Sequence, residues 1–143
     1  KWKEDMKKQF NLSAEILRPG TAKKLEKDLP IGKSIFDIIP FTIVSLDWIK
    51  SDRNRESFLR SCGEFVIVDE AHTCAARKGG LRQQRYQLIK GLSKNLNRHL
   101  LLLTATPHSG DSEAFDNLLG LLDSKFDNLN LLFLLHSNSH LHQ

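Results

Sequence analysis

The sequence predicts an α/β protein in which a parallel sheet is flanked by helices. Two continuous apolar runs, "EFVIVDEA" at 64–71 and "HLLLLTATP" at 99–107, are typical of strands buried on both faces. A segment with helical apolar spacing lies between them, and another follows the second run. The order strand, helix, strand, helix indicates parallel strands joined by right-handed crossovers.

The first 34 residues are expected to form one helix followed by a surface segment. Trp2, Met6 and Phe10 recur at four-residue spacing between charged residues, which predicts an amphipathic helix. The stretch "RPGTAKKLEKDLPIGKS", residues 18–34, is rich in glycine, proline and charge. It predicts a surface loop containing at most one short helix.

A strand and a helix are expected next. Residues 35–49, "IFDIIPFTIVSLDWI", are rich in β-branched and aromatic side chains and predict a strand interrupted near Pro40. Residues 52–62, "DRNRESFLRSC", predict a short helix.

Two further helices are expected after the first buried strand. The segment 81–95 places an apolar stripe on one helical face, formed by Leu81, Leu88, Ile89 and Leu92. Asp111 or Ser112 is expected to cap the last helix. Its predicted core face is formed by Phe115, Leu118, Leu119 and Leu122.

Length and composition limit the possible classes of protein. With 143 residues, 40% of them hydrophobic and 27% charged, the chain suits one globular domain, and no apolar run approaches the roughly 20 residues of a membrane span. Cys62 and Cys74 lack CxxC spacing, so we expect free thiols and a cytoplasmic protein. The net charge of +4 permits a polyanionic partner. Because the first residue is not Met, we expect the true start to lie upstream.

Polar residues follow both predicted buried strands. Asp69 and Glu70 end the first strand, and Thr104 and Thr106 end the second. In an open parallel sheet these ends meet at one rim, where ligands bind. One carboxylate beside a phosphate is a typical Mg²⁺ arrangement, and a second carboxylate can orient or deprotonate a water. Alternatively, acids end a strand only because they favour the start of a following helix.

Four stretches together resemble a known family. "VIVDEAH" (66–72) resembles motif II, and "LLLTATPHSGD" (101–111) resembles motif III, of superfamily-two DEAH-box helicases. "KWKEDMKKQFNL" and "PFTIVSLDWIKSDRNRESFL" resemble the motif Ia and Ib regions of the Snf-type ATPases within that superfamily. The whole pattern is most similar to the bacterial RNA-polymerase-associated translocases.

This resemblance implies that residues 1–128 are the C-terminal portion of a first RecA-like (P-loop NTPase) lobe. Residues 129–143 are low in complexity, so we expect a disordered tail there. By position, Asp69 would hold Mg²⁺ through water and Glu70 would polarise the hydrolytic water. Residues that would couple ATP and Mg²⁺ to the nucleic-acid track are His72, Thr104, Ala105 and Thr106. Ser45 would lie near the phosphate backbone of the nucleic acid.

"PIGKS" at 30–34 matches only the end of a phosphate-binding loop. The position of the first glycine is Lys27, a charged stretch precedes the segment, and a β-prone run follows it. We interpret it as a chance match to the end of the motif, a decoy rather than a phosphate-binding loop. The resemblance places the phosphate-loop strand before Lys1 and leaves the second RecA-like lobe, with its arginine finger, outside the chain. We therefore expect the isolated chain to lack ATPase activity.

The resulting hypothesis is a fragment of an ATP-dependent translocase of double-stranded DNA, serving transcription or DNA defence and using ATP and Mg²⁺, with no membrane partner. One alternative is a conventional strand-separating helicase or a restriction-type motor. Another is a non-catalytic remnant that binds DNA or a protein partner. A metal-dependent hydrolase is disfavoured because the two carboxylates have no further cluster of ligands beside them.

Overall fold

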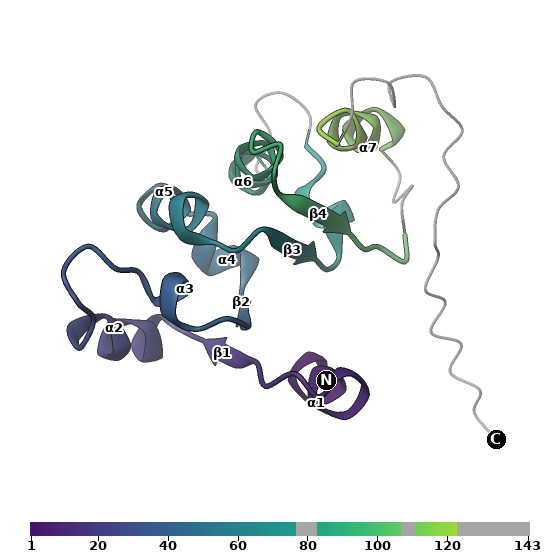
Figure 1. Ribbon diagram of the computed structural model, residues 1–143. Helices are drawn as coiled ribbons and strands as arrows, with labels where there is room; N and C mark the ends of the chain where they lie inside the picture. The colour runs from purple at the N-terminus through teal and green to yellow at the C-terminus, as the bar shows by residue number, and fades with distance from the viewer. Residues whose placement is uncertain (77–82, 107–110, 123–143) are drawn as a thin grey trace. The chain divides into compact units, whose positions relative to one another are not determined.

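The computed structural model describes residues 1–76, 83–106 and 111–122 in two compact units (Figure 1). The first unit spans Lys1–Glu64, and the second begins at Phe65. In the described residues of both units, helices connect and flank a pair of parallel strands, so the predicted α/β class is confirmed.

The first unit contains two strands and five helices. Its elements are α1 (Trp2–Phe10), β1 (Glu15–Leu17), α2 (Pro19–Lys27), α3 (Ile35–Ile38), β2 (Thr42–Val44), α4 (Leu46–Ile49) and α5 (Asp52–Ser61). The strands β1 and β2 pair in parallel, with Ile16 opposite Ile43. The strand β1 was not predicted from the sequence.

The described part of the second unit has the expected order. Its elements are β3 (Phe65–Val68), the 3₁₀ helix η1 (Ala71–Cys74), α6 (Gln83–Ser93), β4 (His99–Leu102) and α7 (Ser112–Leu119). The strands β3 and β4 pair in parallel, in a register that sets Val68 opposite Leu102. The predicted parallel pairing of these two strands is confirmed.

The predicted N-terminal helix is present as α1, and it ends at Asn11, which adopts the left-handed conformation with φ 54°. None of its residues is buried: Trp2 is 38% exposed and Phe10 is 67% exposed. The next helix, α2, begins with Pro19 at its first position, where a missing N–H costs nothing. It is the one short helix expected in this segment.

The strand expected over residues 35–49 is wrong for most of that run. Ser34 and Asp37 form a capping box that starts α3, in which the Ser34 hydroxyl accepts from Phe36 N–H at 3.3 Å and the Asp37 carboxylate accepts from Ser34 N–H at 2.7 Å. These two bonds satisfy backbone donors that a strand would leave to a neighbour. Only Thr42–Val44 is extended and paired, and α4 follows directly.

The capped helix α3 carries Ile35, which is 2% exposed, into the core of the first unit. There Ile35 clusters with Leu17 and Ala22. Partly buried side chains packed against this cluster are Leu29, Phe36, Ile39, Val44 and Trp48. Trp48 is therefore a packing residue.

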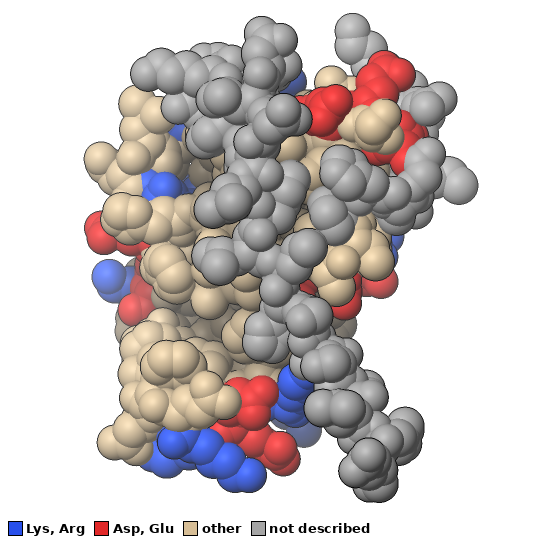
Figure 2. All heavy atoms as spheres, turned by 90° about the vertical axis from the view of Figure 1, so that its right-hand side faces the viewer, with Lys and Arg blue, Asp and Glu red and all other residues tan. Residues whose placement is uncertain are grey.

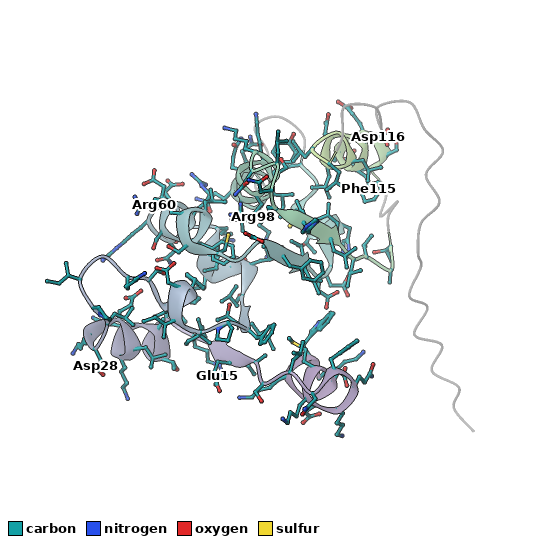
Figure 3. All side chains as sticks on the ribbon, in the orientation of Figure 1. Glu15, Asp28, Arg60, Arg98, Phe115 and Asp116 are labelled. Carbon is teal, nitrogen blue, oxygen red and sulfur yellow. The ribbon has the colours of Figure 1, made fainter. Side chains whose placement is uncertain are left out.

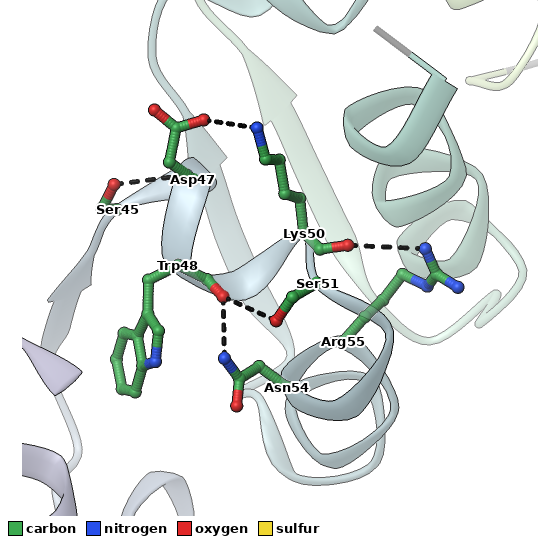
Figure 4. A network of polar contacts seen from close by, with 7 residues as sticks. All are labelled: Ser45, Asp47, Trp48, Lys50, Ser51, Asn54 and Arg55. Carbon is green, nitrogen blue, oxygen red and sulfur yellow. Dashed lines mark hydrogen bonds and ion pairs between the residues drawn. The ribbon is translucent and has the colours of Figure 1, made fainter. Parts of the chain in front are cut away.

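The junction between α4 and α5 is held by side chains that bind backbone carbonyls (Figure 4). The carbonyl oxygen of Trp48 accepts from Ser51 Oγ at 3.2 Å and from Asn54 Nδ2 at 2.9 Å. Lys50 pairs with Asp47 at 2.9 Å across one helical turn. These bonds fix the end of α4 and the start of the predicted helix α5.

The expectation that β3 and β4 are buried on both faces is wrong. Val68 is 4% exposed, whereas Phe65 is 62% exposed and Ile67 and Leu101 are each 42% exposed. Alternate residues of a strand face opposite sides of the sheet. The described helices α6 and α7 lie on one side of the two strands (Figure 1), so only that face is covered within the described part of this unit.

The described residues of the helices in the second unit follow the predicted apolar pattern, and the single correction concerns Leu122. On α6, Leu88, Ile89 and Leu92 are each at most 1% exposed; Leu81, assigned to the same stripe, lies outside the described residues. Arg98 Nη1 donates to the Leu92 carbonyl at 3.3 Å near the end of this helix (Figure 3).

On α7, the Asp111 carboxylate accepts from Ala114 N–H at 3.0 Å, which identifies Asp111 as the cap. Phe115 is buried and Asp116 is exposed on the other side of the helix (Figure 3). Leu122, predicted in the core, is 36% exposed because α7 ends at Leu119 and the chain turns after it.

No helix in the described ranges is both long enough and apolar enough to span a bilayer. On the face shown in Figure 2, the visible Lys and Arg side chains are interspersed with Asp and Glu rather than gathered into a single basic patch.

Candidate nucleotide site

The carboxyl ends of β3 and β4 meet at one edge of their sheet. Beyond the last paired residues, Leu103 N–H donates to the Val68 carbonyl at 2.9 Å, and Ala71 N–H donates to the Leu103 carbonyl at 2.8 Å. Backbone hydrogen bonds between the two segments therefore continue beyond the ends of β3 and β4. As a result, Asp69, Glu70 and Thr104 leave the sheet at the same rim.

The backbone reverses direction at Glu70, which adopts the left-handed conformation with φ 51° and ψ 45°. This conformation costs a residue with a Cβ roughly 1–2 kcal/mol. The turn is supported on both sides, because Glu70 N–H donates to Asp69 Oδ1 at 2.9 Å and the following amide is held by Leu103. Strained residues of this kind concentrate at functional sites. Nothing in the local sequence predicted the conformation, since glutamate is not typical of it.

A hydrogen-bond network joins the two strand ends across the rim. His72 Nδ1 lies 2.9 Å from Thr104 Oγ1 and 3.3 Å from Glu70 Oε2. Thr106 N–H donates to Thr104 Oγ1 at 3.2 Å. The predicted residues Glu70, His72, Thr104 and Thr106 are thus brought together by the fold.

The side chains at this rim differ in their exposure to solvent. The side chain of His72 is 21% exposed, whereas that of Glu70 is 60% exposed. Asp69, Ala105 and Thr106 are also exposed. The carboxylates therefore face solvent at the rim, while the imidazole is held behind them.

The 3₁₀ helix η1 is anchored by small buried side chains. Ala71 is 1% exposed and Cys74 is fully buried. Burial raises the pKa of the Cys74 thiol, against the smaller lowering effects of a Thr73 hydrogen bond and the charge of Arg85. Cys74 is accordingly a packing residue rather than a nucleophile. Cys62 and Cys74 are thiols and are not joined in a disulfide.

Ser45 belongs to the first unit. It is the N-cap of α4, and its Oγ accepts from Asp47 N–H at 3.2 Å (Figure 4). Its hydroxyl therefore has a structural task in starting a helix. The predicted contact between Ser45 and a nucleic-acid backbone stays a prediction.

The surroundings of "PIGKS" differ from those of a phosphate loop. The segment follows α2 rather than a strand. The Ser34 N–H, which a phosphate would need, is already donated to the Asp37 carboxylate. The helix that begins here has only four residues. These features support its interpretation as a decoy.

The rim suits a magnesium ion that keeps most of its water ligands. Among residues 1–76, 83–106 and 111–122 there is no cluster of three or more His, Cys, Asp or Glu side chains able to enclose a metal. Mg²⁺ does not need such a cluster, because it binds through one or two carboxylates together with waters and phosphate oxygens. The exposed carboxylate of Asp69 meets that requirement. The residues 107–110 of the motif III match lie outside the described residues.

Comparison with known proteins identifies homologues over most of the chain. No family model matches the sequence. RNA polymerase-associated protein RapA of Actinobacillus pleuropneumoniae serotype 5b (strain L20) is 33% identical over 128 residues, which is 86% of this chain and 13% of that protein. The RapA proteins of Vibrio atlanticus (strain LGP32) and Vibrio vulnificus (strain YJ016) are each 32% identical, over 85% and 86% of this chain.

The chain spans only 12–13% of the length of these relatives. The matched region nevertheless includes most of the sequence from which the motifs were recognised. The resemblance to the bacterial RNA-polymerase-associated group is thereby confirmed: this chain is homologous to a segment of the RNA polymerase-associated protein RapA.

Proposed function

We propose that this chain is part of the first RecA-like lobe of a Snf-type, ATP-dependent translocase of double-stranded DNA. The observation that supports the proposal best is the shared rim of β3 and β4, where Asp69, Glu70 and Thr104 leave the sheet together. Ligands of open α/β sheets bind at such a rim. The relatives are RNA polymerase-associated by name, which supports RNA polymerase as a partner of the whole protein.

In this proposal the two carboxylates have different tasks. Asp69 holds Mg²⁺ through water, and Glu70 orients and polarises the water that attacks the terminal phosphate of ATP. When bound, the metal neutralises developing charge on the phosphates. His72, Thr104, Ala105 and Thr106 transmit the state of the nucleotide site, and Ser45 contacts the DNA backbone. The phosphate cradle and the second lobe are supplied by other parts of a longer protein.

The proposed metal task of Asp69 is tested with Mn²⁺, which shares the preference of Mg²⁺ for oxygen ligands and broadens nearby NMR signals. In the ¹⁵N-labelled chain, Mn²⁺ is expected to broaden the amide signals of residues 69–71 first. Asp69→Asn should abolish that selectivity. Glu64→Gln is the matched control, because Glu64 is an exposed acid beside the opposite end of β3. Broadening that is unchanged in Asp69→Asn would exclude this metal site.

The proposed division of labour also predicts that the chain alone has no ATP turnover above that of Glu70→Gln. The groups that this proposal assigns to other parts of the protein contribute strongly to the rate of ATP hydrolysis. An arginine finger alone contributes a factor of about 10³–10⁵. Phosphate release is measured with Mg·ATP, with and without duplex DNA. Turnover that depends on Glu70 would show that the chain completes a nucleotide site by itself.

A further inference from the structure

His72 has two competing partners at a single ring nitrogen. Its Nδ1 lies 2.9 Å from Thr104 Oγ1 and 3.3 Å from Glu70 Oε2. A ring nitrogen donates a hydrogen bond when it carries a proton and accepts one when it does not. The position of one proton therefore decides which partner the imidazole can hold.

The two partners differ in what they can accept and donate. The carboxylate of Glu70, when ionised, can only accept, so it is held by Nδ1 only when Nδ1 carries a proton. The Thr104 hydroxyl already accepts from Thr106 N–H, which leaves it one lone pair and one hydrogen. Thr104 can therefore either accept from Nδ1–H or donate to a bare Nδ1.

Building on the proposed function, we propose that His72 is a positioning residue that holds Glu70 in a resting place, and that Thr104 replaces Glu70 on Nδ1 when Glu70 moves to the attacking water. In the resting state, Nδ1–H is shared by Glu70 and Thr104. On release, the ring stays neutral: the proton leaves Nδ1 to solvent and Nε2 takes one up. The Thr104 hydroxyl then turns to donate to Nδ1.

The surrounding backbone supports a movement confined to the Glu70 side chain. The amide of Ala71 is held by the Leu103 carbonyl at 2.8 Å, and Glu70 N–H is held by Asp69. The Glu70 side chain is 60% exposed, whereas the His72 side chain is 21% exposed. The carboxylate thus has room to leave, and the imidazole stays between the two strand ends.

The tautomer of His72 is the direct readout of this contact, because Nδ1 must carry a proton in order to donate to the Glu70 carboxylate. It is measured on the full chain with ¹⁵N-labelled histidine, by NMR, without metal or nucleotide and at a pH where imidazoles are neutral. Wild type is expected to carry the proton on Nδ1. Glu70→Ala should move it to Nε2, and Glu113→Ala, an exposed acid on α7, should leave it in place.

Two further variants make the outcome decisive. Glu70→Gly removes the same carboxylate and suits the left-handed backbone, so it replaces Glu70→Ala if that variant folds poorly. Thr104→Val should keep the proton on Nδ1, because Glu70 remains as the acceptor. A tautomer that changes in Thr104→Val but not in the Glu70 variants would overturn the proposal. Because no nucleotide is present, this result is independent of whether Asp69 binds Mn²⁺.

Discussion

The capping box of α3 offers a quantitative test, because two side chains there override a sequence that favours a strand. Ser34→Ala removes the hydroxyl that accepts from Phe36 N–H. Asp37→Ala removes the carboxylate that accepts from Ser34 N–H at 2.7 Å. Loss of an N-cap Ser side chain typically costs about 1 kcal/mol, within a range of roughly 0.5–2 kcal/mol. Loss of a hydrogen bond such as that accepted by Asp37 typically costs about 0.5–1.5 kcal/mol.

The expected loss for each single variant is therefore about 1 kcal/mol of unfolding free energy. The effect reaches the core, because α3 holds Ile35, 2% exposed, against Leu17 and Ala22. The double variant should lose less than the sum of the two singles, because both bonds hold the same turn. Whole domains have only about 5–15 kcal/mol of stability, so these losses are measurable.

Urea unfolding measures the free energies, and hydrogen exchange reports the amide of Ile39, which bonds the Ile35 carbonyl at 3.0 Å. Ser57→Ala is the matched control: it removes a serine hydroxyl inside α5, where alanine is the better helix former. It should be neutral or slightly stabilising. If Ser34→Ala and Asp37→Ala were as stable as wild type, with unchanged exchange at Ile39, the capping explanation of α3 would be refuted.

Two other predictions concern the second unit. Leu118→Ala should lower the unfolding free energy by about 2–5 kcal/mol, because Leu118 is fully buried. Leu96→Ala is the control and should change it by less than about 0.5 kcal/mol, because Leu96 is 96% exposed. Equal losses in chemical denaturation would contradict the placement of Leu118 in the core of this unit. Burial raises the pKa of Cys74 above its ordinary value of 9.0. The stability contributed by the buried, protonated thiol is therefore fully present below pH 9.0 and is lost as the pH rises through the higher pKa of the folded state. An alkylating reagent at pH 8 should therefore modify the partly exposed Cys62 before Cys74, and mass spectrometry that found Cys74 modified first would contradict the burial.

The helices of this protein were largely predictable from local sequence. Four-residue apolar spacing located α1, and the stripe formed by Leu88, Ile89 and Leu92 located α6. Asp111 marked the start of α7. These features depend on residues within a few positions of one another, which is the range over which helical hydrogen bonds form.

The short elements of the first unit were less predictable. The β-branched run at 35–39 indicated a strand, but the Ser34 and Asp37 cap placed a helix there. The strand β1 has only three residues and exists because it pairs with β2, 27 positions further along in register (Glu15 with Thr42). A strand's partner is distant in sequence, so its own composition is a weak guide.

The candidate site, too, was predictable from the sequence only in part. The residue types at 69–72 and 104–106 were sufficient to indicate oxygen ligands at two strand ends and to recognise the homologous group. Their roles in catalysis remain predictions. What local sequence could not supply was the left-handed backbone of Glu70 and the shared nitrogen of His72. Both depend on the parallel register of β3 and β4, which brings Leu103 and Thr104 beside a turn more than 30 residues earlier in the chain.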